Sequence, residues 1–122
     1  MKKKAFTIME LLIALAIMAI MAAIVVSVYR GYVKKAARSA LQTDTRNCIT
    51  CVSAELARIA LTGGEPDFDN CTNRISRYTQ SCSVTQLGEE LYQCTCSGKG
   101  MISGSTCILN TESTSFEGSN CE

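Results

Sequence analysis

One carboxylate, Glu10, lies at the start of a long apolar segment, and three consecutive lysines come before it. From Leu11 to Tyr29, only Ser27 and the hydroxyl group of Tyr29 interrupt the apolar side chains. A carboxylate in hydrocarbon costs ~2.5 kcal/mol or more, and by default it marks a functional site with a partner. We therefore expect Glu10 to meet a cation.

Eight cysteines are the second group of residues with chemistry of their own: Cys48, Cys51, Cys71, Cys82, Cys94, Cys96, Cys107 and Cys121. Cys48 and Cys51 share one side of a predicted helix, and Cys94 and Cys96 share one face of a predicted strand. Three uses are open: disulfides, a Cys48-x-x-Cys51 redox pair, or a zinc site made by these four. The chain has no histidine, which excludes Ser–His and Cys–His nucleophiles.

Few other residues suggest a ligand. Asp67 and Asp69 are candidate calcium ligands in a loop, although two carboxylates in a loop are more often simply solvated. From Thr62 onward the chain has three basic and eight acidic side chains, which argues against nucleic-acid binding. No glycine-rich phosphate loop is present. We expect no enzymatic activity, no cofactor and no resident metal.

The residues from 6 to 61 are predicted to form one long helix. Leu11 to Tyr29 would rise roughly 28 Å, about one bilayer core, and the lysines before it hold the N-terminus in the cytoplasm. A secretory signal peptide has a shorter apolar region with a cleavage site at its end. Beyond Gly31 an apolar stripe continues at three- and four-residue steps, with one turn skipped at Thr45: Val33, Ala37, Leu41, Cys48, Val52, Leu56 and Ile59.

A small head is predicted from residue 62 to 122. Gly63 and Gly64 end the helix, residues 65–70 form a loop, and strands are expected at about 78–87, 90–97 and 101–110. Apolar residues are sparse in this part, so covalent staples are needed. The predicted fold class is α+β, with one long N-terminal helix packed on a small antiparallel sheet.

The opening sequence Lys-Lys-Lys-Ala-Phe-Thr-Ile-Met-Glu resembles the prepilin signal of type IV pilins and pseudopilins. The resemblance covers roughly the first thirty residues and includes Tyr29 and Tyr32. It implies a leader of residues 1–5 that a prepilin peptidase removes after Ala5. Phe6 would then be N-methylated, and Glu10 would pair with the Phe6 ammonium of a neighbouring subunit.

Two departures from that family pattern stand out. Ala5 replaces the usual glycine before the cut, and alanine is still small enough for a peptidase pocket. Ala19 and Ser27 occupy the positions where many bacterial pilins have glycine and proline. Because proline disfavours helix by ~3 kcal/mol, we expect either a more continuous helix in the filament or a helix that melts there without the usual breakers.

The resemblance also places all eight cysteines outside the cytoplasm, where disulfides persist. Sequence alone allows 105 pairings of eight cysteines. The shared faces suggest two helix-to-sheet bridges from Cys48 and Cys51 to Cys94 and Cys96. Cys107 with Cys121 could then close the C-terminal segment, which resembles the disulfide-bounded C-terminal loop of many pilins, and Cys71 with Cys82 would close the helix-to-strand region.

The resemblance implies a ladle-shaped pilin in four segments: leader 1–5, membrane or filament-core helix 6–30, amphipathic helix 31–61 and disulfide-rich head 62–122. We expect a homopolymer that leaves the inner membrane for an extracellular filament through pilus assembly machinery. A pseudopilin or minor pilin is the alternative within the family, and an anchored redox or zinc protein the alternative outside it. The basic stem and acidic head suggest charge pairing between stacked subunits, although solvated charge explains them equally well.

Overall fold

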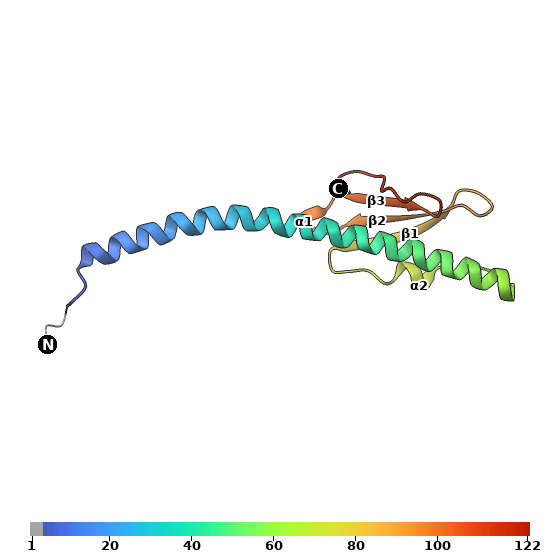
Figure 1. The fold of residues 1–122 in the computed structure, drawn as a ribbon, viewed down its shortest axis with the longest axis horizontal. Helices are drawn as coiled ribbons and strands as arrows, with labels where there is room; N and C mark the ends of the chain where they lie inside the picture. Colours follow the sequence, from blue (N-terminus) through green and yellow to red (C-terminus); the bar gives the residue numbers. More distant parts are fainter. Residues whose placement is uncertain (1–3) are drawn as a thin grey trace. The chain divides into compact units, whose positions relative to one another are not determined.

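The computed structural model describes residues 4–122, so Met1, Lys2 and Lys3 of the predicted leader lie outside the described residues. The elements follow in the order α1 (Ile8–Thr62), α2 (Asp69–Thr72), β1 (Thr79–Gln86), β2 (Tyr92–Gly98), η1 (Gly100–Ile102) and β3 (Thr106–Asn110) (Figure 1). The chain divides into two compact units, Met1–Val33 and Lys34–Glu122. The predicted α+β class, a long N-terminal helix with a three-stranded antiparallel sheet, is confirmed.

Helix α1 passes through Ala19 and Ser27 without a break. The Ser27 hydroxyl donates to the carbonyl of Ile24 at 2.9 Å, so it is satisfied within the helix itself. The helix begins two residues later than predicted, at Ile8 instead of Phe6. It ends as predicted at the two glycines, because Gly63 adopts φ +71° and its N–H donates to the carbonyl of Ile59 at 2.7 Å.

In the Lys34–Glu122 unit, the sheet has the order β1-β2-β3, with both neighbouring pairs antiparallel. Every second residue of β2 is buried, which matches one face of a strand packed on a helix. The outer edge of β3 is covered by the C-terminal segment through paired hydrogen bonds between Ile108 and Glu117. The predicted third strand starts too early: residues 100–102 form η1, and Gly100 and Gly104 both have positive φ.

Two apolar clusters hold the sheet against α1. The first joins Ala37 and Leu41 of α1 to Ile102, and the second joins Val52 of α1 to Tyr92, with Phe68 packed at its margin. The rings of Phe68 and Tyr92 meet edge to face, with centroids 5.2 Å apart. Cysteine side chains make up much of both clusters, so the disulfides are part of the core.

All eight cysteines are paired within residues 4–122. The pairs are Cys48–Cys94, Cys51–Cys71, Cys82–Cys96 and Cys107–Cys121. The predicted pair of helix-to-sheet bridges is wrong, because only Cys48–Cys94 joins α1 to the sheet. Cys71 with Cys82 is also wrong: Cys71 bonds Cys51, and Cys82 bonds Cys96, its direct partner in the strand register.

Candidate functional site: the N-terminal segment

The residues at the predicted cleavage site are outside the helix. Residues 4–7 have no regular structure, and α1 starts at Ile8. Ala5 is exposed and the Phe6 side chain is 85% exposed. The bond between Ala5 and Phe6 is therefore in accessible, non-helical backbone, the conformation in which a protease can take up a peptide.

Thr7 forms the N-cap of α1. The Glu10 N–H lies 3.3 Å from the Thr7 hydroxyl oxygen and 3.1 Å from the Thr7 carbonyl oxygen, and the Leu11 N–H donates to the same carbonyl at 3.2 Å. A Thr-x-x-Glu spacing before an apolar run is the pattern of a capping box. We did not predict this role for Thr7, although the spacing was visible in the sequence.

The Glu10 carboxylate is exposed in the first turn of α1. With residues 4–122 it makes no hydrogen bond through its side chain and no ion pair. Lys4, Ala5, Phe6 and Glu10 line one shallow hollow, so the predicted processing and assembly residues come together there. A carboxylate in the first turn also interacts favourably with the helix dipole. The arrangement leaves an acidic group available for a cation from another molecule.

The prokaryotic N-terminal methylation motif matches residues 1–26, which contain the whole of this segment. The chain carries the type IV prepilin signal. No curated protein and no solved structure matches the chain. The motif supports a type IV pilin-like or pseudopilin protein, a structural class of protein, and it implies a prepilin peptidase and assembly machinery as partners.

The apolar part of the prepilin signal continues into α1. This helix contains an 18-residue window of mean hydropathy 3.0, long and apolar enough to cross a membrane. Its large side chains between Ile8 and Tyr32 are all more than half exposed in the single chain. The signal and this helix fit a membrane-anchored prepilin that later enters a surface filament.

The cysteines of this chain are not arranged for redox or zinc chemistry. Both alternatives need Cys48 and Cys51 to act together, but Cys48 bonds Cys94 and Cys51 bonds Cys71. Among residues 4–122, no group of three or more Cys, Asp or Glu side chains is placed to hold a metal. The Asp67 carboxylate instead accepts a hydrogen bond from the backbone N–H of Asp69 at 3.1 Å, which is the contact of an Asx turn.

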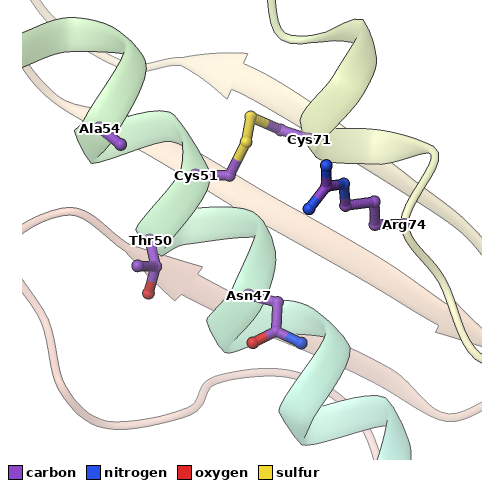
Figure 2. A pocket seen from close by; sticks show the side chains of 6 residues that line it. All are labelled: Asn47, Thr50, Cys51, Ala54, Cys71 and Arg74. Atoms are coloured by element: carbon purple, nitrogen blue, oxygen red, sulfur yellow. A yellow bond between two sulfur atoms is a disulfide. The ribbon is translucent and has the colours of Figure 1, made fainter. Parts of the chain in front are cut away.

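A second hollow borders the Cys51–Cys71 disulfide. Figure 2 shows its lining: Asn47, Thr50, Cys51 and Ala54 from α1, with Cys71 and Arg74 opposite. Arg74 is the one ionisable group among these six residues. The lining therefore has no acid–base pair, and it resembles an ordinary surface groove beside a disulfide.

Asp44 of α1 is a buried structural carboxylate that sequence analysis missed. Its side chain is on the buried side of α1, and Oδ2 accepts from the Ser76 N–H at 2.9 Å and the Ser76 hydroxyl at 2.7 Å. The Thr79 hydroxyl donates to the same oxygen at 2.5 Å. These bonds fix the start of β1 on the helix, and the donors are too far along the chain for any local pattern to reveal.

Proposed function

We propose that the chain is the structural subunit of a type IV pilus-like extracellular filament. A prepilin peptidase cuts after Ala5, Phe6 is N-methylated, and the subunits polymerise through their N-terminal helices. The observation that carries the proposal is a Glu10 carboxylate that pairs with none of residues 4–122, at the start of an exposed apolar helix and just after an accessible Ala5–Phe6 bond.

The apolar surface of α1 supplies the driving force for assembly. Leu12, Leu15 and Val26 are between 51% and 55% exposed. They are examples of the exposed apolar side chains that cover all sides of this part of the helix. Fully burying one such side chain is worth ~1.5–3 kcal/mol relative to water. In the inner membrane lipid covers this surface. In the filament, the helices of other copies replace the lipid.

Glu10 determines the axial position of each subunit relative to its neighbour. Once the helices pack together, its carboxylate leaves water and needs a cation at the same depth. The methylated ammonium of Phe6 on a neighbouring copy is that cation, because it becomes the new N-terminus near Glu10 when residues 1–5 are removed. One pair per subunit then sets how far each copy lies along its neighbour.

The head, residues 62–122, forms the outer surface of the proposed filament. Four disulfides join its strands, its C-terminal segment and α1. Each bridge stabilises a folded domain by ~2–4 kcal/mol, which suits a small domain exposed to shear outside the cell. Residues 6–30 form the filament core and residues 31–61 carry the head.

The deciding experiment replaces Glu10 by Gln in the native host and compares subunits in the sheared filament fraction and in the membrane. We expect Glu10→Gln to be processed normally but to remain in the membrane. Glu112→Gln, which neutralises an exposed head carboxylate, serves as the matched control and should assemble.

Two results would count against the proposal. Normal filaments from Glu10→Gln would show that assembly does not need the charge of this carboxylate. A wild-type subunit that is processed but never reaches the sheared fraction would assign the chain to the pseudopilins, which share the same signal.

A further inference from the structure

The Lys34–Glu122 unit has two ends of opposite charge. One end, which we call the acidic end, comprises the loop after α1 and the β1–β2 turn. Its exposed carboxylates are Glu65, Asp67, Asp69, Glu89 and Glu90. The nearby cation Arg58 is already paired with Glu55, so the charge of this end is uncompensated.

The opposite end, which we call the basic end, comprises the first turn of α1 within this unit, Arg77 and the β2–η1 turn. Lys34, Lys35, Arg77 and Lys99 are all exposed there. Arg38 also belongs to this end, but one of its guanidinium nitrogens donates to the carbonyl oxygen of Glu122 at 3.2 Å. Glu122 is itself an exposed carboxylate at this end, so we set Arg38 against Glu122 and leave both out of the positive charge available to a partner.

The apolar clusters fix which residues lie at which end. Ile102 of η1 packs with Ala37, which places Lys99 beside the Lys34 end of α1. Tyr92, at the start of β2, packs with Val52 and Phe68, which places the β1–β2 turn toward the Thr62 end. Figure 1 shows that turn at the same end of the unit as the last residues of α1. The two ends are about 40 Å apart along the helix.

Both ends also expose large apolar side chains within their charged surroundings. Leu61 is 88% exposed and Leu87 is 51% exposed at the acidic end, and Met101 is 52% exposed at the basic end. An apolar centre with a charged rim is the usual anatomy of a protein–protein interface. Charge and apolar surface thus point to the same two patches.

We propose that the basic end of one copy docks on the acidic end of a copy further along the filament, displaced by about the length of this unit, with Met101 packing near Leu61 and Leu87. The two surfaces are different and lie at opposite ends, so the contact is head-to-tail and repeats without closing. This inference rests on the proposed function, and adds a second contact to the one between N-terminal helices. The charged rims give the contact its orientation.

Zero-length carbodiimide coupling of sheared native filaments tests this contact directly. It joins a carboxylate to an amine that it touches, and peptide mass spectrometry locates the link. We expect links from Lys34, Lys35 or Lys99 to Glu65, Glu89 or Glu90. Within one chain these groups are about 20 Å or more apart along α1 or β2, so each link must join two copies.

Charge reversal provides a second, independent readout. In Glu89→Lys/Glu90→Lys, like charges face each other across the contact, which is strongly unfavourable. We expect at least about a tenfold loss of filament yield after shearing at low salt. Adding Lys34→Glu/Lys35→Glu to that variant should restore the yield. Glu117→Lys reverses an exposed carboxylate between the two ends, where Glu117 pairs with Ile108 in the middle of β3, and should match wild type.

The outcomes separate this inference from the proposed function. Intact filaments without Lys–Glu links between the two ends overturn the contact and leave filament formation standing. Links at these positions, together with rescue by the reversed pair, support it. A reversal variant that assembles like the Glu117→Lys control overturns it as well. A wild-type chain that forms no filaments overturns the proposed function and this contact together.

Discussion

Replacing Asp44 should destabilise the head more than replacing any other single polar residue of α1. Its Oδ2 accepts three hydrogen bonds, from the Ser76 N–H, the Ser76 hydroxyl and the Thr79 hydroxyl. Asp44 is 7% exposed and Thr79 is 3% exposed, so water cannot easily replace the carboxylate. Asp44→Ala leaves three donors without their acceptor.

The expected magnitude follows from these contacts. A hydrogen bond to a charged group contributes about 1.5–3 kcal/mol, and a buried donor left unsatisfied costs about 1–3 kcal/mol. Since Ser76 is only partly buried, we expect Asp44→Ala to lower the free energy of unfolding by roughly 3–5 kcal/mol. Asp44→Asn keeps one carbonyl oxygen where all three bonds converge, and should cost about 1–2 kcal/mol.

The assay is denaturant unfolding of the full chain in detergent, followed by near-ultraviolet circular dichroism of the head tyrosines with the disulfides intact. Thr43→Ala is the matched control, because Thr43 is the neighbouring residue on the exposed side and its hydroxyl bonds only the Ser39 carbonyl. That control should stay within about 0.5 kcal/mol of wild type. If Asp44→Ala unfolded at the same denaturant concentration as Thr43→Ala, the reasoning would be refuted.

Three further predictions concern the rest of the head. Hydrogen bonds from Arg58 and then from the Asp67 backbone lower the pKa of Glu55 from 4.5 to about 2. The ionised Glu55 therefore stabilises the folded state above pH 4.5, and this stabilisation is lost as the pH falls toward 2. The melting temperatures of wild type and Glu55→Gln should converge over that range. Removing Cys48–Cys94, which spans 46 residues, should cost about 4 kcal/mol, against about 3 kcal/mol for Cys82–Cys96, which spans 14; equal denaturation midpoints for the two double alanine variants would contradict this ranking. Gly118→Ala should lower the melting temperature far more than Gly104→Ala, since both glycines have positive φ but only at Gly118 would a Cβ lie 2.1 Å from the Thr106 carbonyl oxygen.

The long helix was predictable because its signals are local. The apolar run and the three- and four-residue stripe indicate α1, and the two glycines mark its end. The predicted apolar stripe missed only buried residues of α1 that are polar. Thr45 is fully buried because its hydroxyl bonds the Leu41 carbonyl at 2.8 Å, and Asp44 is buried because donors from residues 76 and 79 meet it. The spacing of apolar residues does not reveal a polar side chain that is buried because a residue far along the chain hydrogen-bonds to it.

The disulfide pairing shows the limit of arguments from shared faces. Cys48 and Cys51 do lie on one side of α1, but positions three apart differ by about 60° around a helix. That rotation is enough for Cys48 to meet β2 and Cys51 to meet α2. The Cys82–Cys96 pair depends on the register of β1 on β2, which no residue near either cysteine specifies.

The residues of the candidate site were predictable from the sequence, but the prediction of its local structure was incomplete. The sequence placed Ala5, Phe6 and Glu10 in one segment, and the structure gathers them around one hollow. It did not reveal that Thr7 caps the helix and leaves the cleavage bond in non-helical backbone. A single chain contains no neighbouring subunit, so the partner of Glu10 stays a prediction.

The most direct test of the central claim is the intact mass of the protein from sheared surface filaments, measured before and after reduction. The account predicts a mass that lacks residues 1–5 and carries one added methyl group, with a gain of eight hydrogens when the four disulfides are reduced. A full-length, unmethylated mass found only in the membrane fraction would contradict processing at Ala5 and assembly into a filament.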